Sequence, residues 1–203
     1  IDQGYGDGAT IDNTGGLIMA TNGGLVRIQA GINPVITGGA LKITDSGTLS
    51  IDGNATFTNT TAHVASGGLV KQMGGRSYWQ DMVLMNEGTM SVYSGNSGNS
   101  RNIFFQNGCT VTNTGVIKSI VQDGMDGGAS YVVLEAGALL YNNGLLVITN
   151  ERMIASASGV ACFNWKGGEF INNGTILLSG SSTANDAATY FRPTENATNR
   201  LEG

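Results

Sequence analysis

Side chains able to do chemistry are few in this chain of 203 residues, and most of them stand far apart. The sequence has one histidine, His63, which cannot form a metal cluster alone or a Cys/His zinc site with two distant cysteines. The close acidic pair in a glycine-rich loop is Asp123 and Asp126, a weak candidate for a cation such as Ca²⁺, because a dedicated site has more ligands. A solvated turn is the simpler interpretation of this pair, and a catalytic pair is the least favoured one. We therefore expect no enzyme activity, no cofactor and no strong metal site.

One short pattern, apolar-x-Asn-x-Gly-x-apolar, recurs along the chain. The structure that this repeat forms determines which side chains share a surface. The asparagines of the pattern are Asn86, Asn113, Asn142 and Asn172, and a degenerate copy surrounds Asn59. From Asn59 onward the spacing between successive asparagines is nearly constant and grows only slightly along the chain. A near-constant period of this size indicates a repeat architecture in which each unit buries its apolar face against its neighbours.

Apolar residues flank each asparagine with the alternation of β-strands. Two residues before it the column reads Phe57, Leu84, Val111, Leu140 and Phe170, and four residues after it the column reads His63, Met90, Ile117, Leu146 and Ile176. Asn-x-Gly between two strands supplies the positive φ angles of a tight turn, so each copy predicts a β-arch. Apolar runs at residues 103–105, 131–134 and 160–163 predict a third strand. His63 interrupts its column and is interpreted as a local irregularity of register, not as a ligand.

The predicted fold is therefore all-β: a parallel β-helix, or β-solenoid, of stacked β-arches with about 27–30 residues per coil. Each strand would pair in parallel with its counterpart in the next coil, about 4.8 Å away. In such a stack Asn86, Asn113, Asn142 and Asn172 would form a ladder, since an amide both donates and accepts hydrogen bonds. The alternative is that asparagine is only tolerated at a left-handed turn position.

We expect one elongated domain over residues 1–203. Regular coils are predicted for residues 55–180 and a polar C-terminal tail for residues 181–203. In residues 1–54 the pattern recurs around Asn13, Asn22 and Asp45 at shorter and irregular spacings. This indicates that more than one arch of a coil uses the pattern there, and it leaves the coil boundaries before residue 55 unassigned.

Composition favours an extracellular or cell-surface protein. The chain has 32 glycines and only two prolines, which is typical of a solenoid made of short strands and turns. Its 10 Lys and Arg residues are scattered among 15 Asp and Glu residues, so we expect no nucleic-acid groove. No apolar run approaches the length of a membrane-spanning segment. The first residues, Ile1-Asp2-Gln3-Gly4, are typical of a mature product or an excised fragment.

Two cysteines and one sequon are candidate modification sites. Cys109 and Cys162 lie about two coils apart, an axial distance of roughly 9.6 Å that exceeds the roughly 7 Å Cα limit for a disulfide within one chain. Both are interpreted as small buried side chains or, alternatively, as partners in disulfides between subunits. Of four Asn-x-Ser/Thr sequons, the one at Asn196 stands in a polar segment where a glycan would not disturb stacking.

Two segments resemble a known group of proteins. Residues 11–17 (IDNTGGL) and 41–54 (LKITDSGTLSIDGN) are similar to the repeats of filamentous-haemagglutinin-like exoproteins and autotransporter passengers, which are β-helical bacterial adhesins. The resemblance implies a secreted β-helix that works as an adhesin. In architecture, stacked arches with sparse cysteines are also similar to the amyloid-like sheath proteins of filamentous methanogenic archaea, which implies self-assembly.

Two functions follow from these patterns. A β-helix exposes unpaired backbone at its ends, and no amphipathic capping helix is predicted in residues 1–20 or 180–203. We therefore predict a self-assembling extracellular building block of a sheath, surface layer or filament, whose partners are copies of itself. The alternative is a stalk or glycan-binding segment of a longer secreted adhesin, in which Tyr78, Trp79 and Trp165 would stack on sugars. A polysaccharide-acting β-helix enzyme is less favoured than either.

Overall fold

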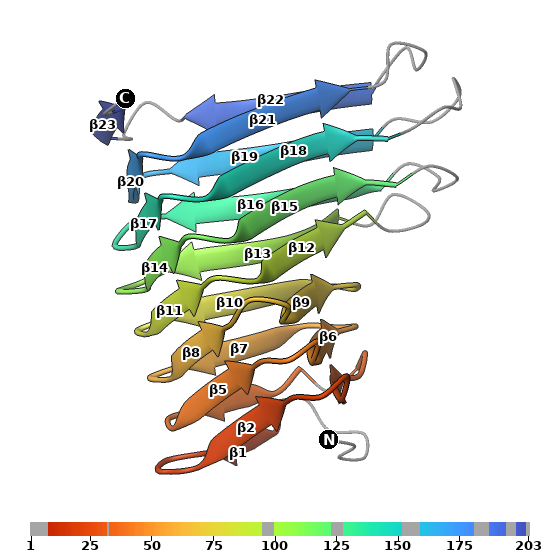
Figure 1. Ribbon diagram of the computed structural model, residues 1–203, viewed down its shortest axis with the longest axis vertical. Coiled ribbons are helices and arrows are strands. Elements are labelled where there is room, and N and C mark those ends of the chain that lie inside the picture. Colours follow the sequence, from red (N-terminus) through yellow and green to blue (C-terminus); the bar gives the residue numbers. More distant parts are fainter. Residues whose placement is uncertain are drawn as a thin grey trace.

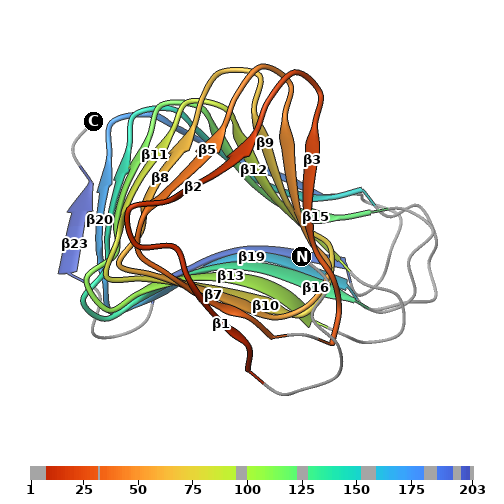
Figure 2. The ribbon, with the colours of Figure 1, turned by 90° about the horizontal axis from the view of Figure 1, so that it is seen from below.

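The computed structural model describes residues 8–31, 33–94, 100–122, 128–151, 159–180, 187–193 and 198–201, and all regular structure among them is β-strand. Successive strands belong in turn to three parallel sheets, so that each coil adds one strand to each sheet (Figure 1). Viewed along the stack, the sheets form three sides of the coil (Figure 2). The predicted all-β parallel solenoid is confirmed.

The three sheets are named here A, B and C in the order in which the chain visits them. Sheet A contains β1 (Thr10–Asp12), β4 (Val35–Thr37), β7 (Ala55–Thr58), β10 (Arg76–Gln80), β13 (Ser100–Gln106), β16 (Ala129–Glu135), β19 (Gly159–Lys166) and β22 (Ala187–Pro193). Sheet B contains β2 (Leu17–Ala20), β5 (Ala40–Ile43), β8 (Thr61–Val64), β11 (Val83–Asn86), β14 (Thr110–Asn113), β17 (Leu139–Asn142), β20 (Glu169–Asn172) and β23 (Thr198–Leu201). Sheet C contains β3 (Leu25–Ile28), β6 (Thr48–Ile51), β9 (Leu69–Gln72), β12 (Thr89–Tyr93), β15 (Val116–Val121), β18 (Leu145–Asn150) and β21 (Thr175–Gly180).

The coil lengthens along the chain. In sheet B, Leu17 pairs with Ala40 in the first coils and Leu139 pairs with Glu169 in the later ones, so the later partners are further apart in sequence. Added residues fall in the connections from sheet C to sheet A, since three residues separate β9 from β10 and eight separate β18 from β19. They also fall in the strands of sheets A and C, since β7 and β9 have four residues each whereas β16 has seven and β18 has six. The predicted period therefore holds for the C-terminal coils, and the N-terminal coils are shorter.

The degenerate copy around Asn59 belongs to a different corner of the coil from the other four. In sheet B, Val64 pairs with Asn86, and Phe57 lies in β7 of sheet A. The predicted columns that grouped Phe57 and His63 with the apolar residues of the later copies are therefore wrong. Asn59 has a φ of 52° in the turn from sheet A to sheet B. Asparagine is favoured at such left-handed positions, so the two corners look alike in sequence.

Both ends of the chain add ordered strands to the stack. Asn13 follows β1 at the corner between sheets A and B, and Asn22 lies between β2 and β3, which confirms that more than one arch uses the pattern there. After residue 186, β22 and β23 pair in parallel with β19 and β20. The predicted polar tail over residues 181–203 is therefore wrong for these strands. Pairing with the coil beneath satisfies backbone groups whatever the polarity of the side chains.

The glycines of the later copies have a different role from the predicted one. Gly88, Gly115, Gly144 and Gly174 do not have positive φ angles. A Cβ atom at Gly115 would overlap the carbonyl oxygen of Gly88 in the coil beneath, and the same relation recurs at the next two glycines of the column. Glycine is required here because successive backbones approach closely.

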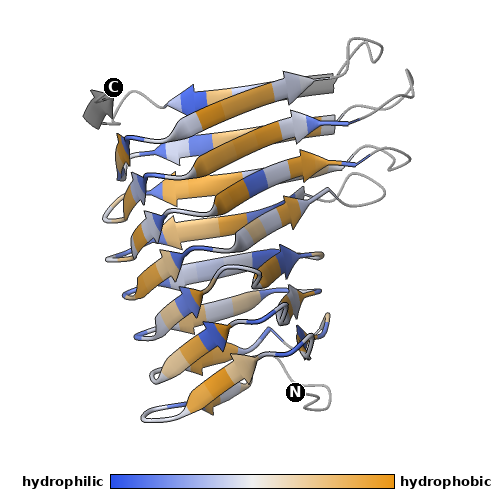
Figure 3. Ribbon diagram, in the orientation of Figure 1, coloured by the Kyte–Doolittle hydropathy of each residue, from blue (hydrophilic) through white to orange (hydrophobic). Residues whose placement is uncertain are grey.

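One apolar core runs through the stack, and Figure 3 shows apolar residues in every coil. Its fully buried members include Leu84, Met90, Val111, Ile117, Leu140, Leu146 and Phe170. The aromatic rings of Phe57 and Trp79 also pack against each other in adjacent coils, with centroids 4.5 Å apart. Each fully buried large side chain contributes roughly 1.5–3 kcal/mol, so the core, built coil by coil, stabilises the whole stack.

Replacing Ile117 with Asp should prevent folding, because an unpaired carboxylate in this core costs more than about 3 kcal/mol. Val116→Asp is the matched control, since Val116 is adjacent in β15 and only half-buried. Urea unfolding followed by far-UV circular dichroism measures both variants. Equal stability of the two would contradict the inward placement of Ile117.

Candidate functional site

Four asparagines form a hydrogen-bonded ladder at the corner between sheets B and C, in which Asn86, Asn113 and Asn142 are buried and Asn172 is half-buried. Asn86 Nδ2 donates to Asn113 Oδ1, Asn113 Nδ2 to Asn142 Oδ1, and Asn142 Nδ2 to Asn172 Oδ1, each at 2.6 Å. Each asparagine is the last residue of its strand in sheet B, and none has a positive φ angle. These residues are therefore placed by side-chain hydrogen bonding between coils and not by a left-handed turn.

The ladder begins and ends within the stack. Val64 occupies the position beneath Asn86, and Asn86 Oδ1 is buried without a hydrogen-bond partner among the described residues. At the other end, Asn172 Nδ2 donates to the carbonyl oxygen of Gly174 at 3.2 Å. The ladder joins four coils into one unit, and its amide groups are used by each other, so it is part of the scaffold and not a ligand site.

Replacing Asn113 with Ala should lower the free energy of unfolding by about 1–3 kcal/mol, because it removes two rungs and leaves a buried acceptor on Asn142 unpaired. Asn143→Ala is the matched control. Asn143 accepts a hydrogen bond from Asn173 at 3.1 Å in an exposed rung beside the ladder, so its loss should cost less. Urea unfolding of both variants tests this, and equal losses would show that burial of the ladder contributes nothing.

Both cysteines are buried free thiols. Cys109 lies in the apolar core, and burial, followed by the nearby Asp81 carboxylate, raises its pKa to about 12. Cys162 is buried on the face of β19 opposite to Phe163, and burial raises its pKa to about 11. A disulfide between subunits would require a buried thiol to become accessible. The geometry therefore favours the packing interpretation of both residues.

The thiols should not react with Ellman's reagent at pH 8 in the folded protein, and two should react after unfolding in guanidinium. Because their folded pKa values lie above the ordinary value of about 9, their contribution to stability is complete below pH 9 and is lost as the pH rises from 9 towards 12. Rapid reaction in the native state, or disulfide-linked multimers on non-reducing gels, would contradict this placement.

The other predicted site residues do not come together. Asp123, Asp126 and Asn196 lie outside the described residues. His63 Nε2 lies 2.8 Å from Glu87 Oε2 in an exposed pair on sheet B. Within the described chain no group of three or more His, Cys, Asp or Glu side chains is arranged to hold a metal, and no helix is long and apolar enough to cross a membrane.

The three aromatic residues suggested for sugar stacking have different environments. Trp79 and Trp165 are buried in the core. Tyr78 alternates with Trp79 along β10, so it faces outward, where its ring stacks on Phe104 with centroids 5.0 Å apart and an interplanar angle of 17°. Because Phe104 covers one face of the Tyr78 ring, these residues do not form an open platform for sugars.

The core of the stack is only partly covered at its two ends. Five side chains pack against the core but are only partly buried: Ile11, Ile18, Val26, Ile176 and Phe191. The first three lie in β1, β2 and β3, and the last two lie in β21 and β22. Among the described residues each of these strands is the end strand of its sheet, and β23 is the end strand of sheet B on the C-terminal side. The described chain therefore has a half-covered core layer at each end.

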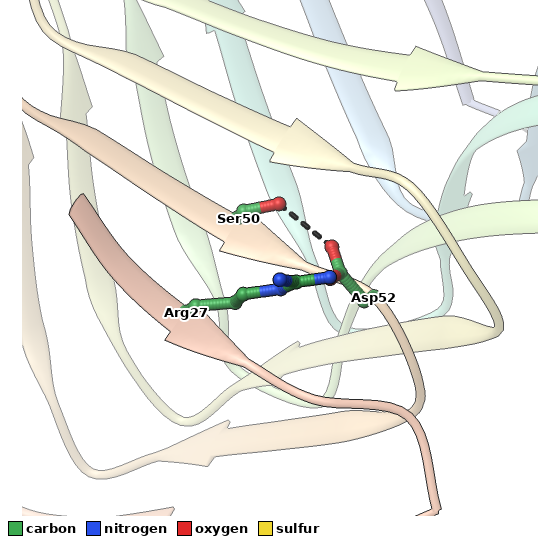
Figure 4. A network of polar contacts seen from close by, with 3 residues as sticks. All are labelled: Arg27, Ser50 and Asp52. Carbon is green, nitrogen blue, oxygen red and sulfur yellow. Dashed lines mark hydrogen bonds and ion pairs between the residues drawn. The ribbon is translucent and has the colours of Figure 1, made fainter.

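A charged groove lies on the outer face of sheet C near the N-terminal end. Arg27 Nε contacts Asp52 Oδ2, and Ser50 Oγ donates to Asp52 Oδ1 at 2.7 Å (Figure 4). The groove has a volume of about 480 Å³ and is lined by Leu25, Arg27, Thr48, Ser50, Asp52, Lys71 and Met73. Sequence reasoning missed it because the register of these coils was unassigned. The sequence signal that could have revealed the groove is the distance of one short coil between Arg27 and Ser50. This distance places the two residues side by side in sheet C.

Comparisons with known proteins add little. No protein-family model matches the sequence, and no curated protein matches it. Among solved structures, the chain is similar to a TibC-catalyzed hyper-glycosylated fragment of TibA, with 14% identity over 91% of this chain and 92% of that one. The TM-score of 0.19 is too low to support an argument about function. The described strands by themselves define the class of the protein as a parallel β-solenoid.

Proposed function

We propose that this chain is a structural building block of the cell exterior whose subunits join end to end into a sheath, surface layer or filament. The observation that carries the proposal is the half-covered core layer at each end of the stack. No catalytic role is part of it. The protein would act through its shape and its surfaces.

The two ends offer compatible surfaces. At the N-terminal end, Ile11, Ile18 and Val26 supply one apolar side chain from each sheet, and at the C-terminal end Ile176 and Phe191 supply apolar side chains from sheets C and A. A second copy set on either end would cover these side chains and pair the free edges of the outer strands. Both effects favour association, since burial removes apolar area from water and edge strands carry unpaired backbone groups.

The direction of the strands determines the kind of assembly. All three sheets are parallel, so the N-terminal and C-terminal ends of the stack present different surfaces. Contact between unlike ends is heterologous, and such a contact repeats from subunit to subunit instead of closing in a dimer. A filament, or a larger layer of filaments, is the expected product.

The glycan-binding alternative has less support. Two of its three aromatic candidates lie in the core, and Tyr78 is stacked on Phe104. An adhesive role would therefore depend on the polar outer faces of the sheets rather than on aromatic platforms.

Replacing Ile18 with Lys should prevent end-to-end association, because it places a charge in the surface that a neighbour would cover. The monomer should stay folded, since Ile18 is only partly buried and a lysine at this position reaches water through the open end. Leu17→Lys is the matched control, because Leu17 is adjacent but faces outward with 52% of its surface exposed.

Sedimentation velocity and negative-stain electron microscopy measure the outcome. We expect rods or filaments for the wild type and for Leu17→Lys, and folded monomers for Ile18→Lys. A wild type that remains monomeric at high concentration would contradict the proposal, and so would equal assembly of all three proteins.

A further inference from the structure

A column of basic and small polar side chains runs along the outer face of sheet C. Register places Arg27, Ser50, Lys71, Ser91 and Lys118 side by side in β3, β6, β9, β12 and β15. The residues on either side of each member along its strand face the core, so the column faces outward. The sequence of types is cation, serine, cation, serine, cation.

The cations of this column are regularly spaced. Arg27, Lys71 and Lys118 stand in every second strand of the sheet. Because adjacent strands lie about 4.8 Å apart, neighbouring cations are about 9.6 Å apart along the axis of the stack. The protein as a whole has a net charge of −5, yet the seven strands of sheet C contain no Asp or Glu. Asp52, just after β6, is paired with Arg27, which leaves Lys71 and Lys118 as the less neutralised members.

Ser91, between the two lysines, is an unsatisfied polar group. Its side chain is 1% exposed, and its Oγ has no hydrogen-bond partner among the described residues. Met90 and Val92 on either side of it are buried in the core, so Ser91 points to the outer face. A buried hydroxyl without a partner costs about 1–3 kcal/mol, and Ser91 therefore lies beneath the surface of the column, where its small side chain adds no bulk between the two lysines.

We propose that this column binds an acidic polysaccharide that lies along the axis of the stack and carries one carboxylate on every second sugar. Lys71 and Lys118 would each pair with one carboxylate, and the small, buried Ser91 would leave room for the neutral sugar between them. The charged groove at Arg27 extends the same surface toward the N-terminal end. The proposal is independent of end-to-end assembly, because the column lies on a side of the stack and not at its ends.

The spacing distinguishes this ligand from a nucleic acid. A DNA strand carries a phosphate about every 3.4 Å along the helix axis, so most of its phosphates would find no cation in a column with one about every 9.6 Å. Single-stranded nucleic acids are also held by rows of aromatic side chains under successive bases. The column contains serines at those positions. Sparse, regular carboxylates separated by neutral, hydroxyl-rich sugars fit the arrangement better.

The test is the binding of hyaluronan, which has one carboxylate per disaccharide, measured by isothermal titration calorimetry at low ionic strength. The variant Lys71→Gln/Lys118→Gln should bind about tenfold more weakly, since two exposed ion pairs together contribute about 1.4 kcal/mol. Lys42→Gln/Lys166→Gln is the matched control, because it makes the same change of charge at exposed positions on sheets B and A. It should bind almost as the wild type does.

A second variant separates binding from folding. Ser91→Ala should leave hyaluronan binding unchanged, because the Ser91 hydroxyl is buried out of reach of the ligand, and it should leave the fold equally or more stable, because it removes a buried group that has no partner. Equal losses of hyaluronan affinity in Lys71→Gln/Lys118→Gln and Lys42→Gln/Lys166→Gln would show a general effect of charge and would overturn the proposal. Absence of hyaluronan binding, or tighter binding of single-stranded DNA, would overturn it as well.

Discussion

Close stacking of one coil on the next is the constraint on which the rest of this structure depends. Parallel pairing holds successive backbones at the spacing of adjacent strands, so any position that recurs in every coil must tolerate a copy of itself directly above and below. At the corner between sheets B and C this requirement selects two residues. Glycine at positions such as 115 and 144 leaves room for the carbonyl oxygen beneath, and asparagine at positions such as 113 and 142 bonds to its own copies. The apolar columns satisfy the same requirement because each apolar side chain packs against the apolar side chain at the same position in the next coil.

The same constraint explains how much the sequence predicted. Asn-x-Gly copies from residue 84 onward belong to one corner, so their alignment predicted the β-arches, the position of the ladder and the buried columns, although Ile176 at the C-terminal end is only partly buried. In the earlier coils the column beneath Asn86 contains Val64 and Ile43, and the turn that follows each is longer by two residues, so the pattern has no fixed anchor there. Asparagine also serves the corner between sheets A and B, as at Asn59, and this produced the wrong alignment of Phe57 and His63. The strands beyond residue 186 were missed because no Asn-x-Gly copy follows the one at Asn172, although Phe191 of β22 packs against the core.

Function in a molecule of this kind resides on its surfaces, because the interior is occupied by packing and by the ladder. Two surfaces differ from the rest. The ends present half-covered core layers, which favour contact with further copies, and the outer face of sheet C presents regularly spaced cations, which favour a linear polyanion. The two are compatible, since the cationic column lies on a side of the stack and contact between the ends would leave it exposed. A structural layer that also holds an acidic polysaccharide is a coherent role for such a protein.

Exchange of side-chain amide protons with deuterium, measured by NMR, tests the stacked ladder most directly. The account predicts that the Nδ2 protons of Asn113 and Asn142 exchange as slowly as backbone amides in the adjacent strands, because both groups are buried and hydrogen-bonded to the next coil. Those of Asn143, one residue further on and exposed, should exchange rapidly. Rapid exchange of all three side chains, with protected backbone strands, would contradict the ladder and the register that it defines.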